Sequence, residues 1–123
     1  FDVCSYATTA ALNSCKLPKY EMQNDLPVQI ENETIDPPIT TIPISVTMAR
    51  IGDYILVDPN MDEWSCLDAR ITITTNSDGN VVALQKGGPE GFTSDQLIKC
   101  AEISIQVGLK IREIIKEATK GSN

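Results

Sequence analysis

The sequence contains no histidine, no CxxC pair and no long apolar run. Without histidine the chain lacks the most common general base and the most common metal ligand, so sites of the Ser-His-Asp, Cys-His and HExxH types are excluded within it. A membrane-spanning helix needs about 20 mostly apolar residues, which no stretch supplies, and no secretory signal peptide is visible. We therefore expect no membrane association, and carboxylates are the main groups left for chemistry.

Positive charge is also scarce in this chain. Lys and Arg together number 10 against 17 Asp and Glu, which gives a net charge of -7. The phosphate backbone repels such an acidic chain, so broad, charge-driven binding to nucleic acid by this chain alone is disfavoured. A contact with RNA or DNA has to be local or shared with a partner. The 123 residues suffice for one small domain around a single core.

The four cysteines, Cys4, Cys15, Cys66 and Cys100, are widely spaced and have no histidine beside them. This spacing is not that of a zinc site, and we expect neither a metal nor another cofactor. Cys4 and Cys15 would lie roughly 16 Å apart along a helix, which is too far for a disulfide. The cysteines are expected to be buried thiols of a reduced, intracellular protein.

The Ala-rich stretch DVCSYATTAALNSC predicts a helix within residues 1–17. Its small and apolar side chains recur at helical spacing and form one stripe that would pack closely against another element: Val3, Tyr6, Ala7, Ala10, Ala11 and Ser14. Pro18 is expected to end this helix. Residues 18–42 hold four prolines and several acids, and they predict a surface arm rather than a linker between two domains.

Residues 43–86 have a hydrophobic pattern of period two, which predicts strands. Large apolar side chains alternate with smaller ones over residues 44–48, and the Gly52-Asp53 turn leads into a strand at residues 54–57. The stretches ARITITT and VVALQ form a further hairpin, in which Gly79 supplies the positive φ of the turn. These four strands are expected to form one antiparallel sheet.

One long helix is predicted over residues 93–120. Thr93 with Gln96 three residues later is a capping-box start, and Gly121 is a natural stop. The apolar side chains form a stripe that should lie across the sheet: Cys100, Ile103, Val107, Ile111, Ile114 and Ala118, flanked by Leu97 and Ile115. The helix dipole favours cations near the C-terminal end, which accounts for four basic residues without an RNA-binding role: Lys110, Arg112, Lys116 and Lys120.

The fold class that follows from these elements is α+β. One domain over residues 1–123 is expected to combine a four-stranded antiparallel sheet with the long C-terminal helix packed on it and a further helix at the N-terminal end.

The stretch VDPNMDEWSCLDARITI gathers four carboxylates around one short connection: Asp58, Asp62, Glu63 and Asp68. A hard cation takes oxygen ligands of this kind, but scattered acids without a nucleophile are a weak signal. The favoured alternative is an acidic rim in water, with Trp64 and Leu67 packed inward. The KGGPEG stretch could cradle a phosphate or could be a flexible strand-to-helix turn, and the turn is favoured.

Three stretches in this order resemble the C-terminal half of an RNase PH-like subunit of the RNA exosome: CSYATTAALNSCKLPKYE, ISVTMARIGDYILVDPNMDEWSCLDARITITTNSDGNVVALQKGG and TSDQLIKCAEISIQVGLKIREIIK. The resemblance is closest to the archaeal non-catalytic ring subunit and is weakest over residues 22–40. Because family members are longer, Phe1 is expected to correspond to a point inside the last helix of an N-terminal half.

The resemblance also implies where a catalytic site would lie. Phosphorolytic members carry one Asp at an LDL-like strand end and a second Asp in an E-[AV]-D-M run entering the next strand, for acid catalysis and metal binding. Asp58 matches the first position, but the alignment places Ala69 at the second and Asp68 one residue earlier. Because side chains alternate across a strand, this displacement turns the carboxylate to the other face. We expect a degenerate former site with no catalytic residue.

By resemblance, the chain is expected to belong to a non-catalytic structural subunit of the exosome core. Such a subunit, completed by its own N-terminal half, alternates with a catalytic RNase PH-like partner in a hexameric ring. Cap subunits with S1 or KH modules cover the ring, and single-stranded RNA enters the assembly for 3′→5′ degradation. No residue of this half is assigned to RNA binding.

Two other functions remain as alternatives. The chain could be half of a phosphorolytic 3′→5′ exoribonuclease, which Ala69 disfavours, or a stand-alone binding module. The resemblance implies a cytoplasmic location for an archaeal protein, and the nucleus and cytoplasm for a eukaryotic one.

Overall fold

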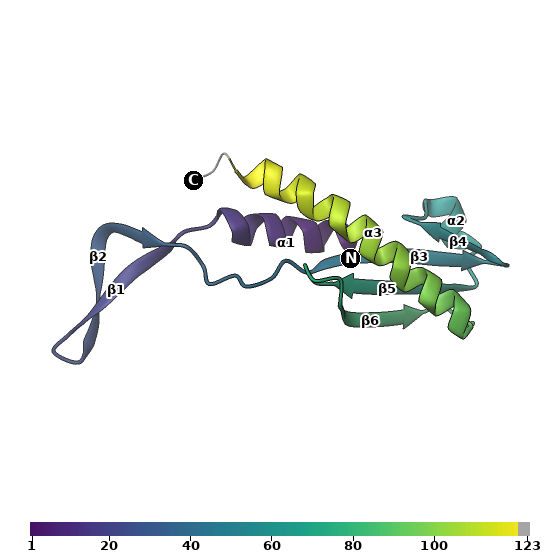
Figure 1. Ribbon diagram of the computed structural model, residues 1–123, viewed down its shortest axis with the longest axis horizontal. Coiled ribbons are helices and arrows are strands. Elements are labelled where there is room, and N and C mark those ends of the chain that lie inside the picture. The colour runs from purple at the N-terminus through teal and green to yellow at the C-terminus, as the bar shows by residue number, and fades with distance from the viewer. Residues whose placement is uncertain (121–123) are drawn as a thin grey trace.

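The computed structural model describes residues 1–120, in which helices pack on a sheet and a long arm extends from one end (Figure 1). The elements in chain order are α1 (Asp2–Ser14), β1 (Leu17–Gln23), β2 (Leu26–Ile35), β3 (Ile44–Ile51), β4 (Tyr54–Val57), α2 (Met61–Ser65), β5 (Ala69–Thr75), β6 (Val81–Gly87) and α3 (Ser94–Thr119). The predicted α+β fold class is confirmed. The predicted stop at Gly121 lies outside the described residues. Among those described, no helix combines the length and apolarity needed to cross a membrane.

The four-stranded sheet has the order β4-β3-β5-β6, with antiparallel neighbours throughout. One face carries the large aliphatic side chains of β3 and β5, which are almost completely buried: Ile44, Val46, Met48, Ile71 and Ile73. α3 lies diagonally across this face (Figure 1) and adds Cys100 and Ile115 to the same core. The period-two pattern was therefore a correct guide to strands and core, and Gly79 has the predicted positive φ of +81°.

The long helix α3 begins as predicted, and most of its predicted apolar stripe faces the sheet. Thr93 and Gln96 form the capping box. Cys100 is buried, and Ile103, Val107 and Ile111 are partly buried against the core. The prediction was wrong for the last two members, because Ile114 is 60% exposed and Ala118 is exposed too. The fully buried residues of the helix are Cys100, Ser104, Gly108, Arg112 and Ile115. The cause is close packing: a Cβ on Gly108 would lie only 2.8 Å from Thr75 Oγ1. Ser104 and Gly108 therefore mark the closest contact of α3 with the sheet, and larger apolar residues pack on either side of them.

Arg112 was expected to stand near the end of the helix because the helix dipole favours cations there, but the structure gives it a further role in the core. Its side chain is only 3% exposed, and burial lowers the pKa of its guanidinium. Nε donates to the carbonyl of Ile42 at 2.8 Å, and Nη2 donates to Thr75 Oγ1 at 2.9 Å and to the Thr75 carbonyl. Arg112 thus ties α3 to the chain entering β3 and to the end of β5, because buried carbonyls need donors.

Helix α1 lies beside β3 where the short strand β4 does not reach. Its inward residues include Tyr6, Thr9 and Ala10, whereas Val3 is 78% exposed and Ala7 and Ala11 are exposed too. The predicted stripe of small residues was therefore half wrong, because polar contacts to β3 decide which face packs. The helix ends at Ser14, since the backbone is already extended at Cys15, before the predicted stop at Pro18.

The arm was predicted as a surface segment with no strand assigned to it, but it contains a two-stranded antiparallel ribbon of β1 and β2. Asn24 and Asp25 both have positive φ (51° and 64°), the signature of a two-residue hairpin turn. Pro18 and Pro27 are accommodated because both strands are edges. The arm leaves the body beyond the C-terminal end of α1 (Figure 1).

The cysteines are free thiols, but only one is buried. Cys100 lies in the core, and burial raises the pKa of its thiol. Cys4 and Cys66 are exposed and Cys15 is partly exposed, so the expectation of four buried thiols was wrong for three of them.

Candidate functional site

Asp58 stands at the end of β4 beside an open cleft of about 200 Å³. Its backbone has a φ of +54°, which few residues other than glycine adopt, and its N–H donates to the Thr47 carbonyl at 3.2 Å. The cleft is lined by residues of α1, β3, β5, β6 and the connection after β4: Phe1, Asp2, Val3, Thr47, Asp58, Pro59, Trp64, Arg70, Thr72 and Gln85. Thr47, Thr72 and Gln85 are register partners, so they share the sheet face opposite the core.

The second carboxylate at the cleft, Asp2, is hydrogen-bonded to β3 through both of its oxygens. Its two oxygens accept hydrogen bonds from the backbone N–H of Thr47 at 2.6 Å and from Thr47 Oγ1 at 2.7 Å. These bonds satisfy the part of β3 that β4 leaves unpaired, so Asp2 fixes α1 to the sheet.

Tyr6, one turn further along α1, donates its hydroxyl to the Ser45 carbonyl at 2.8 Å. Burial, together with the negative charges of Asp2 and Asp58, raises the pKa of Tyr6 to about 12. The phenol therefore keeps its proton at neutral pH, and it cannot act there as a general base.

Arg70 is the charged residue of β5 that faces this cleft. Its guanidinium carbon lies 4.9 Å from the centre of the Trp64 ring, a cation–π arrangement. The side chain also covers Gly87 of β6, where an added Cβ would collide with it. The cleft thus places a cation, rather than a second free acid, on the sheet near Asp58. Trp64 was predicted to pack inward, but it is partly exposed because it stacks on this arginine.

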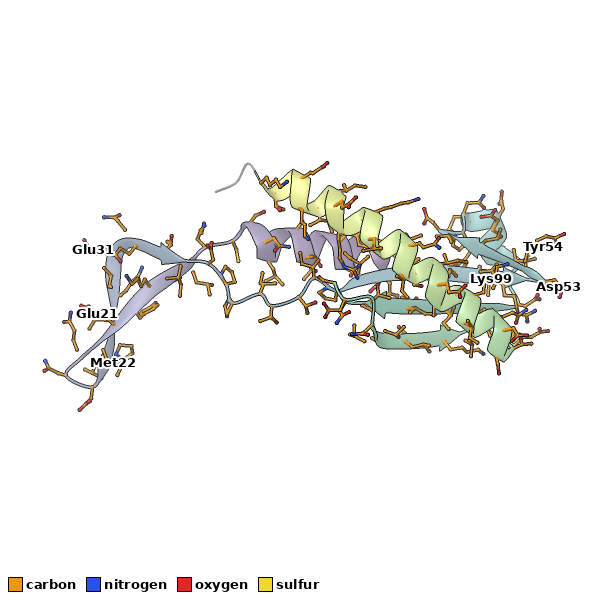
Figure 2. The ribbon with its side chains drawn as sticks, in the orientation of Figure 1. Glu21, Met22, Glu31, Asp53, Tyr54 and Lys99 are labelled. Atoms are coloured by element: carbon orange, nitrogen blue, oxygen red, sulfur yellow. The ribbon has the colours of Figure 1, made fainter. Side chains whose placement is uncertain are left out.

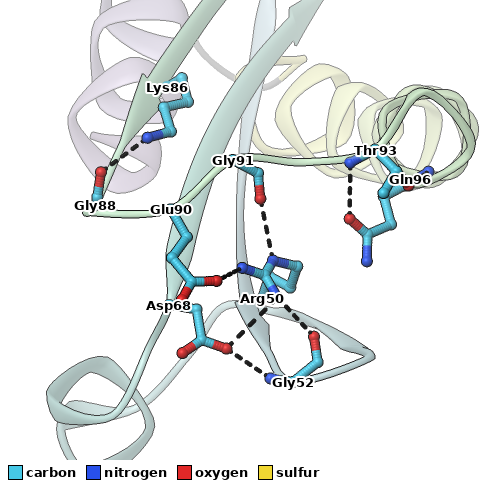
Figure 3. A network of polar contacts seen from close by, with 9 residues as sticks. All are labelled: Arg50, Gly52, Asp68, Lys86, Gly88, Glu90, Gly91, Thr93 and Gln96. Carbon is cyan, nitrogen blue, oxygen red and sulfur yellow. Dashed lines mark hydrogen bonds and ion pairs between the residues drawn. The ribbon is translucent and has the colours of Figure 1, made fainter.

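Asp68 lies outside that cleft and takes part in a different network (Figure 3). Its Oδ2 accepts from the backbone N–H of Gly52 at 2.7 Å and lies 3.6 Å from Arg50 Nη1. Arg50 donates in turn to the carbonyls of Gly52 and Gly91, at 2.9 and 3.2 Å, and to the Glu90 carboxylate. This network joins the turn between β3 and β4 to the loop before α3.

Ala69 is completely buried at the start of β5. It belongs to the core-facing set of that strand, and a Cβ on Gly88 would lie 3.0 Å from its Cα. A carboxylate on position 69 of this backbone would therefore point into the core rather than into the cleft with Asp58.

The acids between β4 and β5 do not converge. Asp62 and Glu63 lie in the first turn of α2, a short helix that the sequence did not predict. Its N-cap Asn60 accepts from the N–H groups of both acids, while Glu63 Oε2 accepts from the Asn60 N–H at 2.8 Å. In residues 1–120, no three His, Cys, Asp or Glu side chains stand close enough to share a metal ion.

The Gly-rich loop is a packed turn. Gly88 has a φ of +87°, the Glu90 N–H donates to the Asp68 carbonyl at 3.0 Å, and Lys86 Nζ donates to the Gly88 carbonyl at 2.8 Å. Gly88 serves close approach to the start of β5, since a Cβ there would lie 3.1 Å from the Asp68 carbonyl, and the turn agrees with the favoured interpretation.

Sequence reasoning missed two residues that line the cleft, Asp2 and Arg70, and it missed the hydrogen bond of Tyr6 to β3. The alternation along ARITITT could have placed Arg70 beside Thr72 on the polar sheet face, and from there into the cleft. No local pattern signals the roles of Asp2 and Tyr6, because their partners on β3 are 45 and 39 residues away.

Comparison with known proteins adds a family relationship. Residues 41–107 match the sequence model of the 3′ exoribonuclease family, domain 2. The chain is 36% identical over 119 residues to exosome complex component Rrp42 of Thermococcus gammatolerans, covering 96% of this chain and 44% of the relative. Identity to exosome complex component Rrp42 of Thermoplasma acidophilum is 36% over 112 residues, covering 91% of this chain and 40% of the relative.

Two solved structures have a similar fold. One is the Archaeoglobus fulgidus exosome with RNA bound to the active site, with a TM-score of 0.61 and 38% identity over 67% of this chain and 32% of that chain. The other is an archaeal exosome core, with a TM-score of 0.63 and 38% identity over 69% of this chain and 34% of that chain. This chain spans less than half the length of the relatives that it matches.

Proposed function

This chain belongs to the 3′ exoribonuclease family, and we propose that it is one half of a non-catalytic ring subunit of an exosome-type complex. Its partner in the ring is a catalytic RNase PH-like subunit that degrades single-stranded RNA from the 3′ end. Similarity to exosome complex component Rrp42 and to two archaeal exosome structures supports the assembly. In an archaeal cell such a complex acts in the cytoplasm, with cap subunits above the ring.

The observation that carries the non-catalytic assignment is the set of charged groups that line the cleft with Asp58, namely Asp2 and Arg70. Phosphorolysis with an acid and a metal ion needs a second carboxylate close to the first. In the cleft, Asp2 is held by two hydrogen bonds from Thr47, and the sheet contributes Arg70. Asp68 is committed to Gly52 and Arg50 outside the cleft. A cation at this point lowers the affinity for a divalent metal ion, so the subunit shapes the assembly rather than reacting with RNA.

The test measures release of nucleoside diphosphates from single-stranded RNA in phosphate buffer with Mg²⁺ or Mn²⁺. The full-length protein alone should release none, and activity should appear when the catalytic subunit is added. Asp58→Asn in the complex should leave the rate within about threefold, because a working general acid contributes on the order of 10²–10⁴-fold. Asp62→Asn, an exposed acid of α2, is the matched control.

Two results would contradict the proposal. Phosphorolysis by the full-length protein without its partner, abolished by Asp58→Asn or Asp68→Asn, would make this chain half of an active enzyme. Failure to associate with any catalytic subunit of the family would remove the ring assignment.

A further inference from the structure

The ribbon of β1 and β2 stands free of the rest of the molecule (Figure 1). Every residue from Lys16 to Asp36 is exposed except Ile30, which is half-buried. Within the described residues, β1 and β2 share their main tertiary contacts only with each other. A lone two-stranded ribbon is marginally stable in water, and its two outer edges leave backbone N–H and C=O groups unpaired. A surface of this kind is typical of a segment that is ordered by a partner.

Large apolar side chains cover both sides of the ribbon. Tyr20 and Met22 lie on one side, and Leu26 and Val28 lie on the other by the register of the pairing. Met22 is 68% exposed and Leu26 is 67% exposed. Exposed apolar groups on both faces of so narrow a ribbon are typical of a protein-binding surface.

The arm is also acidic. Residues 17–36 contain Lys19 and five acids: Glu21, Asp25, Glu31, Glu33 and Asp36, so they carry -4 of the net charge of -7. Glu33 and Asp36 are paired with Lys19 and Lys16, each at 2.6 Å. In residues 1–120, Glu21, Asp25 and Glu31 have no basic side chain within ion-pair distance. Figure 2 shows Glu21 and Glu31 projecting from the ribbon together with Met22.

These charges narrow the choice of partner. RNA is repelled by a segment of net charge -4. A second copy of this chain is disfavoured as well, because its remaining residues also carry a net negative charge. The complementary surface is a protein groove with apolar walls and a rim of Lys and Arg.

We propose that the arm docks into such a basic, apolar-walled groove on the neighbouring catalytic subunit of the ring. This inference rests on the proposed function, because it names the contact through which the two subunits recognise each other. Tyr20, Met22, Leu26 and Val28 enter the groove, and Glu21 and Glu31 meet its basic rim. An open edge of the ribbon can in addition pair with a strand of the partner.

The experiment measures the affinity of the full-length protein for the catalytic subunit by surface plasmon resonance. Glu21→Lys with Glu31→Lys should raise Kd at least tenfold at about 0.1 M salt, and the difference should shrink at about 0.5 M salt because ions screen the contact. Met22→Ser with Leu26→Ser should raise Kd at least tenfold at both salt concentrations. Glu102→Lys with Glu113→Lys, on the exposed side of α3, makes the same charge change on the body and should leave Kd within about twofold.

Amide hydrogen exchange of the same proteins gives a second measurement. The amides of β1 and β2 should exchange rapidly in the free protein and at least tenfold more slowly in the complex. Wild-type affinity in both arm variants, with unchanged exchange, would overturn the docking proposal and leave the ring assignment intact. No association of the wild-type protein with the catalytic subunit would overturn both.

Two further outcomes would show that the arm binds a different partner, and either one would overturn the proposal. If the arm variants lower the Tm of the uncomplexed full-length protein by several degrees, the arm packs on the protein's own other half. If the free wild-type protein is dimeric by light scattering and the arm variants are monomeric, the arm binds a second copy.

Discussion

At the scale of single residues, the chemistry of the cleft is decided by which carboxylates are free. Asp2 is bound to Thr47 and Asp68 to Gly52, so each stabilises the fold at a place where backbone donors would otherwise lack acceptors. Asp58 is the carboxylate of the cleft that remains exposed. Arg70 of β5 contributes a positive charge to the same cleft. Acids that a sequence places close together can therefore perform unrelated tasks in the structure.

Tyr6 should give α1 a distinct alkaline sensitivity. The folded protein holds the phenol proton up to a pKa of about 12, whereas an unfolded chain releases it near pH 10, so this contribution to stability is complete below about pH 10 and is lost between about pH 10 and 12. Tyr6 is partly solvated, so the loss should be about 1–2 kcal/mol. Urea unfolding at about pH 9 and 11.5 measures this loss of unfolding free energy, and Tyr6→Phe should lack the part that Tyr6 contributes.

The same variant has a second, pH-independent effect. Loss of the hydrogen bond to the Ser45 carbonyl should cost about 1 kcal/mol at every pH. Tyr54→Phe, at an exposed side chain at the start of β4, is the control and should leave the pH dependence unchanged. If wild-type and Tyr6→Phe curves lose stability in parallel above pH 10, the phenol is not the responsible group.

At the scale of elements, the side of α3 that meets the sheet is set by packing rather than by the count of apolar residues. Ile115 is 6% exposed and its neighbour Ile114 is 60% exposed. Ile115→Ala should lower the free energy of unfolding by about 2–5 kcal/mol, since it removes buried methyl groups and leaves a cavity. Ile114→Ala should change it by less than about 0.5 kcal/mol. Equal losses in thermal or urea unfolding would mean that the helix face is different.

Elements that depend on residues close together in sequence could be predicted, and features that depend on residues far apart in sequence could not. The strands and the capping box at Thr93 depend on neighbours in sequence, so a local pattern contained them. The Asn24-Asp25 turn was also present locally, but the prolines and acids around it predicted only a surface arm. The face of α3 depends on the fit of Gly108 against Thr75, and the burial of Arg112 depends on carbonyls far away in sequence. A pattern of neighbouring residues gives no information about such long-range contacts.

In the candidate site, too, features set by neighbours in sequence could be predicted and features set by distant residues could not. The position of Asp58 at the end of a strand could be read from the sequence, as could the alternation that separates Ala69 from its neighbours. The stacking of Arg70 on Trp64 could not, because a short unpredicted helix, α2, places that ring.

At the scale of the whole molecule, the negative charge of the chain governs what it can bind alone. Non-specific RNA binding has a typical Kd of about 10⁻⁴–10⁻⁶ M and depends on Lys and Arg contacts to phosphates. This chain should give no fluorescence anisotropy change with labelled single-stranded RNA at about 10 µM protein and 0.1 M salt. The assembled complex is the positive control. Micromolar binding by the chain alone that weakens steeply with salt would contradict this expectation.

The arm also affects the order of folding. α1 reaches β3 through hydrogen bonds between residues 45 and 39 positions apart, so it must close a long loop before those bonds can form. When β1 pairs with β2, Lys16 is brought within 2.6 Å of Asp36, and the chain that separates the bonded residues becomes roughly twofold shorter. Loop-closure entropy then opposes the docking of α1 by about 0.6 kcal/mol less. Early formation of the ribbon therefore makes the docking of α1 on the sheet easier, because α1 then closes a shorter loop.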